Sequence, residues 1–322
     1  MAHAPTPFYP LRRLSRLWGG EIWVKRDDLT GMELSGNKVR KLEYLLAQAL
    51  ERGADTIITC GGIQSNHCRA TTFACARLGL KVVLLLRGEL PDVADGNYYL
   101  DLLGGAQVNF ITPDDYYHRL PESLEEVAQK VREDGGKPYI IPEGGSNALG
   151  AWGYVEAIRE LHAQCRQAGV EPHTIVIPSS SGGTHAGLFA GTRREGWEVK
   201  VCSAAVSEPT DETRKRISHI LEEMNATFNL NLHFRGEDIW VDDQFIGEGY
   251  AQASSQDLQV IGEVARTEGV VLDPVYTGKA ARMLKERLKE REIATPVVFW
   301  HTGGLFGLFS YRQRIKELVD GR

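Results

Sequence analysis

The sequence is poor in the residues that cross-link small folds or gather metal ions. It has only five cysteines among 322 residues, an odd number, and no two of them form a C-x-x-C pair. Unpaired cysteines within apolar runs are commonplace in proteins of reducing compartments. We therefore predict no disulfide framework and no metal site, and we expect the protein in the cytoplasm.

Long apolar runs and an excess of positive charge are also absent. No run approaches the ~20 residues that cross a bilayer, and the formal net charge is −6. Nucleic acids and anionic membranes both attract dense positive charge. These absences argue against nucleic-acid and membrane partners and leave a small molecule as the expected ligand.

Acidic residues are missing from the first twenty positions, although basic ones are present. That composition is typical of a mitochondrial transit peptide. Three prolines would interrupt the amphipathic helix that such a peptide needs: Pro5, Pro7 and Pro10. We therefore expect this segment to be part of the folded protein, with the mitochondrial matrix as the alternative location in a eukaryote.

Strand-like and helix-like segments alternate along the chain. Apolar runs rich in β-forming residues lie at 56–60, 82–86, 108–111, 139–142, 174–178, 201–206 and 297–300. Helical patterns such as "GYVEAIRELHAQCRQ" separate most of them. The alternation predicts an α/β fold of βαβ units, with parallel sheets covered on both faces. The length suits two domains better than a single core.

Five turns rich in glycine and hydroxyl residues follow predicted strands, the fourth after a strand expected at 271–275. They read "GGIQSNHCR" (61–69), "EGGSNALG" (143–150), "SSSGGTHAG" (179–187), "YTGKA" (276–280) and "HTGGLFG" (301–307). Any one of them could simply end a strand or cap a helix. Because ligands of parallel sheets bind at the carboxyl ends of strands, the five together predict a shared site.

The third of these turns predicts a phosphate site. Its glycines expose successive backbone N–H groups, and the positive end of a helix opened by Thr184 lies behind them. The turn matches neither the P-loop nor the dinucleotide-binding pattern, which disfavours ATP and dinucleotides. A small phosphate monoester is the better candidate.

Lys38 lies in a short polar turn of "LSGNKVRKLEYLL", just before a predicted helix. The apolar residues at helical spacing in that helix predict its buried stripe: Val39, Leu42, Leu45, Leu46, Ala49 and Leu50. A solvated first-turn lysine is the simple alternative. Beside a phosphate cup and many hydroxyls, however, the lysine fits pyridoxal 5′-phosphate, because its amine can form a Schiff base with the aldehyde. Partial burial would lower the pKa of that amine.

Six segments also carry a resemblance to a known family. They are "VKRDDLTGMELSGNKVRKLEYLL", "CGGIQSNHCRATTFACARLGL", "IPEGGSNALGAWGYV", "SSSGGTHAGL", "LDPVYTGKA" and "HTGGLFGLF". Together they resemble the 1-aminocyclopropane-1-carboxylate deaminase / D-cysteine desulfhydrase family, in the order that this family has them. These proteins are pyridoxal-phosphate enzymes of fold type II, related more distantly to tryptophan synthase β.

The resemblance implies two three-layer domains built on parallel sheets, with the site between them. The larger, cofactor-binding domain would comprise residues 1–40 and 153–322, and the smaller inserted domain residues 41–152. The resemblance further implies pyridoxal 5′-phosphate as cofactor, a small amino acid as substrate and a homodimer.

The resemblance also assigns roles to residues. Lys38 would be the Schiff-base lysine, and Asn66 would hydrogen-bond the 3′-oxygen of the cofactor ring. The residues expected to hold the phosphate are Lys41, Ser181, Gly182, Gly183 and Thr184. Ser65, with Asn66 and His67, would receive the substrate carboxylate, which suits the free N–H groups where a helix begins.

Tyr250 and Tyr276 would flank the substrate, with Tyr276 acting on the leaving group. Thr277 and Thr302 discriminate within the family, because the deaminases carry an acid and an apolar residue at these positions. We place Thr277 with the substrate contacts and Thr302 with the cofactor contacts.

The two threonines favour a D-cysteine desulfhydrase, since expelling a thiolate is easier than opening a cyclopropane. In this hypothesis Lys38 removes the α-proton, Tyr276 assists the leaving sulfur, and Ser65 belongs to the catalytic set. The products would be pyruvate, ammonia and hydrogen sulfide. A cysteate sulfo-lyase and a deaminase are alternatives. A catalytically silent cofactor-binding protein would predict an impaired Lys38 or phosphate turn, and both are intact.

Overall fold

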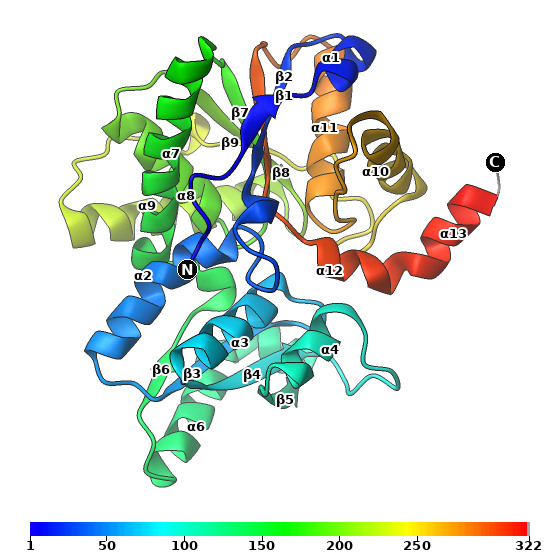
Figure 1. Ribbon diagram of the computed structural model, residues 1–322. Helices are drawn as coiled ribbons and strands as arrows, with labels where there is room; N and C mark the ends of the chain where they lie inside the picture. The colour runs from blue at the N-terminus through cyan, green and yellow to red at the C-terminus, as the bar shows by residue number, and fades with distance from the viewer. Residues whose placement is uncertain (321–322) are drawn as a thin grey trace.

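The computed structural model describes residues 1–320 and contains two sheets, each flanked by helices (Figure 1). The larger sheet has six strands in the order β1-β2-β10-β7-β8-β9. Only β1 runs antiparallel to its neighbour. The strands are β1 (Phe8–Pro10), β2 (Ile22–Arg26), β7 (Thr174–Ser179), β8 (Lys200–Ala205), β9 (Trp240–Asp242) and β10 (Val297–His301).

The smaller sheet has four parallel strands in the order β5-β4-β3-β6. They are β3 (Thr56–Gly62), β4 (Lys81–Arg87), β5 (Gln107–Ile111) and β6 (Pro138–Ile140). This sheet is built from a segment that interrupts the larger one in the sequence. The boundaries expected after residues 40 and 152 stay predictions.

The helices connect the strands and cover the sheets. They are α1 (Arg12–Trp18), α2 (Lys38–Glu51), α3 (Asn66–Leu78), α4 (Gly96–Leu103), α5 (Pro113–His118), α6 (Leu120–Glu133), α7 (Ala148–Ala168), α8 (Gly183–Arg194), α9 (Thr210–Phe228), α10 (Ser255–Glu268), α11 (Thr277–Lys289), α12 (Leu305–Leu308) and α13 (Arg312–Asp320). Single 3₁₀ turns are η1 (Asp27–Leu29), η2 (Glu143–Gly145), η3 (Gly236–Asp238) and η4 (Phe309–Tyr311). No helix within residues 1–320 has the length and apolarity needed to cross a membrane.

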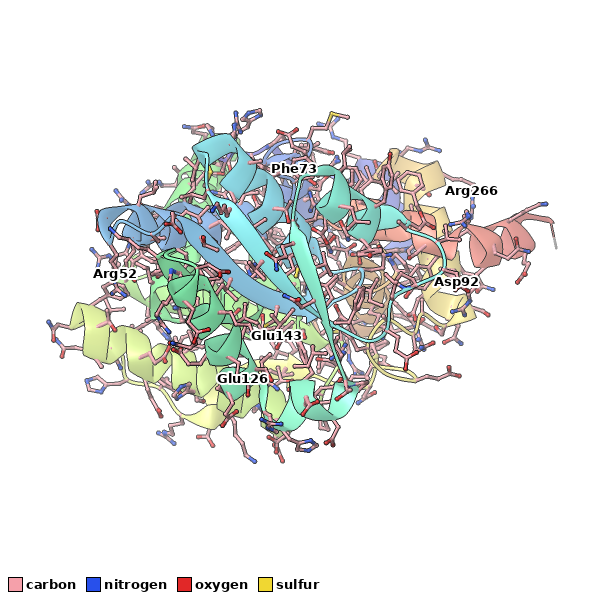
Figure 2. The ribbon with its side chains drawn as sticks, turned by 90° about the horizontal axis from the view of Figure 1, so that it is seen from below. Arg52, Phe73, Asp92, Glu126, Glu143 and Arg266 are labelled. Atoms are coloured by element: carbon pink, nitrogen blue, oxygen red, sulfur yellow. The ribbon has the colours of Figure 1, made fainter. Side chains whose placement is uncertain are left out.

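Each sheet is the middle of three layers. Successive strand residues face opposite sides, so Ile57 of β3 joins the apolar cluster of α3 while Ile58 joins that of α6. In Figure 2, Phe73 on α3 and Glu126 on α6 lie on opposite sides of the smaller sheet. In the larger sheet, Ile175 packs with α7 residues and Val176 with residues of α10 and α11. The predicted α/β fold with parallel sheets is confirmed.

Helix α2 begins at Lys38, where the sequence predicts it, but one residue of its expected apolar stripe is misplaced. Val39, Leu42, Leu45, Leu46 and Ala49 are buried, whereas Leu50 is 44% exposed. Leu50 lies in the last turn of the helix, which ends at Glu51. The stripe therefore ends one residue earlier than predicted.

The strand predicted at 271–275 is wrong, because this segment is irregular. Pro274 has no backbone N–H to offer to a sheet. The Asp273 carboxylate instead accepts hydrogen bonds from the backbone N–H groups of Val275, Tyr276 and Thr277. A side chain thus replaces the neighbouring strand as the partner of this backbone.

A buried ionic network holds the start of α2. The Arg40 guanidinium donates to both carboxylate oxygens of Asp27, each at 2.9 Å, and also pairs with Glu160 of α7 at 2.9 Å. Tyr154 donates to Asp27 at 2.7 Å, and Lys25 pairs with Glu160. Burial alone would raise the pKa of Asp27, but these cations and the tyrosine hydroxyl lower it to about 2. The network connects β2, α2 and α7.

Glycine lets α7 approach the same helix closely. A Cβ placed on Gly153 would lie 2.2 Å from the carbonyl oxygen of Arg40, two residues after Lys38. No side chain fits there unless the two helices move apart. The close contact and the ionic network together fix where α2 begins.

We expect Gly153→Ala to destabilise the protein by about 1–3 kcal/mol, the usual cost of overpacking a dense core. Chemical denaturation measures this change. Gly236→Ala is a matched control, because a Cβ there would meet nothing within 4 Å. Equal stability of the two variants would contradict the close approach of α7 to α2.

Candidate active site

A cavity at the carboxyl ends of both sheets brings most of the predicted site residues together. Its lining includes Lys38, Ser65, Asn66, His67, Ser181, Gly182, Thr184, Tyr250, Tyr276 and Thr302. Three predicted residues do not line it: Lys41, Gly183 and Thr277. Lining residues that the sequence reasoning missed are Asn37, Gly61, Gly62, Glu143, Gly144, Pro178, Ser179, Ser180 and Gly303.

Lys38 is a partly buried amine at the start of α2. Burial lowers its pKa to about 8, against a smaller opposing effect of the Glu143 carboxylate. Within residues 1–320 the amine has no hydrogen-bond partner. A substantial fraction of this amine is therefore neutral and nucleophilic near neutral pH, as a Schiff-base lysine requires.

The turn before Lys38 is fastened to two other turns of the cavity. The backbone N–H of Asn37 donates to the Thr302 carbonyl at 2.9 Å, and its side-chain amide donates to Thr184 Oγ1 at 3.0 Å. Gly36 has φ +100°, and a Cβ there would lie 2.9 Å from the Thr302 oxygen. Glycine is therefore required at this bend, which keeps Lys38 between the predicted phosphate turn and Thr302.

The turn before α8 has the features of a phosphate cup. Gly182 has φ +81°, and a Cβ on Gly183 would lie 2.6 Å from Ser146 Oγ and 2.9 Å from Lys41 Nζ. The first N–H groups of α8 are free of helical partners and carry partial positive charge. The buried hydroxyl of Ser179, in the cavity wall, has no partner within the described part of the chain.

Lys41 lies behind this cup. Its amine donates to Ser146 Oγ at 3.0 Å and to the Gly144 carbonyl at 3.2 Å, and no carboxylate pairs with it within residues 1–320. Burial and the nearby Lys38 lower its pKa well below the ordinary value. A buried amine without a counter-ion is stabilised by a bound anion, so the donor set of this corner fits a phosphate group.

The turn before α3 combines a capped helix start with a neutral histidine. Ser65 Oγ accepts from Cys68 N at 3.2 Å, which leaves its own proton for a ligand. Thr59 Oγ donates to the Ile141 carbonyl, so it must accept from His67 Nε2 at 2.9 Å. His67 therefore carries its proton on Nε2. Burial, Lys38 and Lys41 lower the pKa of His67 well below its ordinary value.

Two tyrosines line the cavity and share a hydrogen bond of 2.8 Å between their hydroxyls, Tyr250 and Tyr276. Burial raises the pKa of Tyr250 to about 12, and burial together with Tyr250 raises the pKa of Tyr276 well above its ordinary value. Both remain protonated near neutral pH. The pair can donate protons to a ligand but is a poor base.

Thr277 is placed differently from the expectation that it contacts substrate. It is fully buried behind Tyr276, and its hydroxyl donates to Asp273 Oδ1 at 2.7 Å and accepts from Asp273 N at 2.8 Å. Helix α11 begins at this residue, which turns the side chain back toward Asp273. Thr302, in contrast, lines the cavity.

Glu143 is the acidic residue that the sequence reasoning missed. It follows β6 in the "PEGGSN" turn, lines the cavity and accepts from the Tyr116 hydroxyl at 2.7 Å. Figure 2 labels it near the centre of the view, and its side chain is 37% exposed. The sequence did carry a signal for this residue, because Glu143 is an acidic residue directly after a predicted strand. Within residues 1–320 no three side chains of the types that bind metals lie together.

Comparison with known proteins agrees with this chemistry. The profile of the family described as "Pyridoxal-phosphate dependent enzyme" matches residues 1–303. A Thermotoga maritima protein, provisionally named 1-aminocyclopropane-1-carboxylate deaminase, is 45% identical over 318 residues, which are 97% of each chain. The mitochondrial bifunctional D-cysteine desulfhydrase/1-aminocyclopropane-1-carboxylate deaminase of Arabidopsis thaliana is 40% identical over 99% of this chain and 81% of its own.

A crystal structure described as an ACC deaminase homologue superposes with a TM-score of 0.90 at 35% identity, over 97% of this chain and 93% of that one. The chain therefore belongs to the family of pyridoxal-phosphate-dependent enzymes of fold type II. Within it, the chain falls among the lyases that include D-cysteine desulfhydrases and 1-aminocyclopropane-1-carboxylate deaminases, and its cofactor is pyridoxal 5′-phosphate. The homodimer and the compartment stay predictions.

We expect Lys38→Ala to lose the covalent link to the cofactor. Borohydride treatment followed by intact-protein mass measurement should add one reduced cofactor to the wild-type chain and none to the variant. Lys215→Ala, on an exposed helix face, is the control and should behave as wild type. A cofactor adduct on the Lys38→Ala chain would show that another amine carries the link.

The pH dependence of cofactor uptake offers a second test. Only the neutral amine attacks the aldehyde, and its fraction rises with pH until the pKa is passed. Because the pKa of Lys38 is lowered to about 8 from the ordinary 10.5, the uptake rate of cofactor-free protein should level off above that pH. Stopped-flow absorbance measures the rate. A rate that still rises near the ordinary lysine pKa would contradict a desolvated Lys38.

Proposed function

We propose that the protein is a D-cysteine desulfhydrase, which converts D-cysteine and water to pyruvate, ammonia and hydrogen sulfide. The observation that carries the proposal is the protonated tyrosine pair, Tyr250 and Tyr276, in the same cavity as the Lys38 amine. A β-elimination needs a base for the α-proton and an acid for the leaving sulfur. Lys38 and Tyr276 supply these two functions.

When bound, pyridoxal phosphate supplies an aldehyde for the substrate amine and a ring that accepts the electron pair left at the α-carbon. The phosphate turn, residues 181–184, and Lys41 would hold the phosphate, and Asn66 would donate to the ring oxygen. Ser65 and the first N–H groups of α3 bind the substrate carboxylate. Tyr276 protonates the sulfur as its bond to carbon breaks, and Tyr250 orients the Tyr276 hydroxyl.

The absence of an acid at position 277 supports the desulfhydrase over the deaminase. The Thr277 hydroxyl is held by Asp273 and does not line the cavity, while Thr302 offers the cavity a neutral hydroxyl. A thiolate leaves readily without the deeper electron sink that a nearby acid would create. The bifunctional name of the Arabidopsis relative supports the desulfhydrase reaction and keeps the deaminase as an alternative.

Incubation of the purified protein with D-cysteine should release sulfide and pyruvate in equal amounts. Tyr276→Phe should lower kcat by about 10²–10⁴-fold, the usual contribution of a general acid. With β-chloro-D-alanine the loss should be much smaller, because chloride leaves without a proton. Tyr99→Phe, at an exposed position, is the control. Equal losses with both substrates would contradict the role of Tyr276, and no sulfide from wild type would contradict the function.

A specific observation also favours a cysteate sulfo-lyase as the second candidate. An outer cavity shares Gly62, Glu143, Ser180 and Tyr250 with the site and adds Arg87. The Arg87 guanidinium lies 5.2 Å from the centre of the Tyr250 ring and donates to the Tyr117 hydroxyl at 2.6 Å. No carboxylate pairs with it within the described residues, so it is available to a sulfonate.

Arg87→Met separates the two candidates. If L-cysteate is the substrate, kcat/KM for cysteate should fall by about 10- to 150-fold, the value of one charged hydrogen bond. If D-cysteine is the substrate, kcat/KM for D-cysteine should change little, because its thiol carries no anionic group to that position. Parallel assays of sulfite and sulfide release with wild type and variant measure both effects.

A further inference from the structure

Asn97 is a fully buried residue in the first turn of α4, outside the cavity lining. Its side-chain nitrogen lies 3.0 Å from the carbonyl oxygen of Gln64 and 2.9 Å from Oδ1 of Asn66. It therefore contacts, from behind, the turn that carries the cavity residues Ser65 and Asn66. Neither the sequence reasoning nor the reaction proposed above assigns it a role.

The hydrogen bonds around Asn97 determine the orientation of Asn66. A backbone carbonyl can only accept a hydrogen bond, so the Asn97 atom that faces Gln64 O must be the NH₂ group. That group has two protons, and the second is directed at the Asn66 carboxamide. Asn66 must then present its oxygen to Asn97. The NH₂ group of Asn66 is left for the cavity, which Asn66 lines.

We propose that Asn97 is a positioning residue that holds the Asn66 carboxamide with its NH₂ group toward the cofactor. The inference rests on the role of Asn66 in the proposed function. Without Asn97, the Asn66 carboxamide could rotate by half a turn and present an oxygen to the oxygen of the cofactor ring. The two oxygens would repel each other, whereas the NH₂ group in the native orientation would donate a hydrogen bond to the ring oxygen.

Further hydrogen bonds around Asn97 hold its side chain against Gln64 and Asn66. Asn97 N donates to Gln64 Oε1 at 2.8 Å, and Gln64 Nε2 donates to the Asp95 carbonyl at 2.9 Å. Gly96 has φ +55°, and a Cβ there would lie 2.4 Å from Gln64 Oε1. Four hydrogen bonds thus join the starts of α3 and α4, and glycine at position 96 allows them to approach. These hydrogen bonds fix the orientation of the Asn97 carboxamide, and through it that of Asn66.

The orientation has a spectroscopic consequence. A hydrogen bond donated to an ionised oxygen favours the ionised form. The NH₂ group of Asn66 therefore lowers the pH at which the ring oxygen of the bound cofactor loses its proton, and the visible absorbance of the holoenzyme reports that ionisation without substrate. An Asn66 carboxamide with its oxygen toward the ring would raise the pH at which the ring oxygen ionises.

The test uses Asn97→Asp in the holoenzyme. The substitution keeps the shape but replaces the NH₂ group with an oxygen, which repels Gln64 O and favours a rotated Asn66. We expect the pH midpoint of the visible band to rise by about one pH unit, with a lower kcat. Asn225→Ala removes two side-chain hydrogen bonds to the backbone of Leu232, outside the cavity lining, and should leave the midpoint unchanged.

A double-mutant cycle shows whether Asn97 acts through Asn66. Asn66→Ala alone should raise the midpoint, and Asn97→Asp should add nothing in that background. An equal shift in both backgrounds would overturn the proposal, as would no shift on Asn97→Asp when Asn66→Ala does shift. No shift on Asn66→Ala would overturn it through the role of Asn66, while sulfide release by wild type would still stand as an independent measure of the proposed function.

If Asn97→Asp does not fold, Asn97→Ser replaces it. The serine hydroxyl can still bond to Gln64 O but is too short to reach Asn66, so the same upward shift is expected. A folded Asn97→Ser protein with the wild-type midpoint would overturn the proposal.

Discussion

The ion pair between Arg40 and Asp27 determines where Lys38 lies in the molecule. Arg40 is two residues along α2 from the reactive amine, and Asp27 follows directly after β2 of the larger sheet. Glu160 of α7 completes the network, and Gly153 brings that helix against the Arg40 carbonyl. A buried pair of this kind adds little net stability compared with an apolar core, but it fixes the position of α2. The network therefore holds the start of the helix that carries the amine against the larger sheet and α7.

The electrostatics of the cavity follow from this placement. Lys38, Lys41 and His67 all have pKa values lowered by burial, and Lys41 and His67 are lowered further by neighbouring lysines. Within residues 1–320, no carboxylate pairs with either lysine amine. Around these two amines, the cavity therefore lacks a negative charge to balance them. Lys41 and the turn at 181–184 would hold a phosphate monoester there, and the neutral amine of Lys38 would be available to the aldehyde of the same molecule.

Sequence patterns were sufficient for the alternating strands and helices, because parallel strands buried on both faces read as continuous apolar runs. They also pointed to Lys38 and the phosphate turn, which the structure brings to one cavity, and the roles of these residues stay predictions. They failed at 271–275, where a side chain of Asp273 replaces a neighbouring strand. They also placed Thr277 among the substrate contacts, whereas its side chain turns toward Asp273, and they passed over Glu143, which lines the cavity. Spacing along the chain shows that a residue is near a site but not which way its side chain turns. Asn97 contacts Asn66 directly, but it lies on α4, a helix that no motif connects to the site.

The most direct measurement is a density map of the purified protein with its bound cofactor. The account predicts continuous density from Lys38 Nζ to the cofactor ring, with the phosphate against residues 181–184 and the Asn66 carboxamide nitrogen beside the ring oxygen. A cofactor joined to another lysine, or a phosphate bound away from the start of α8, would contradict it.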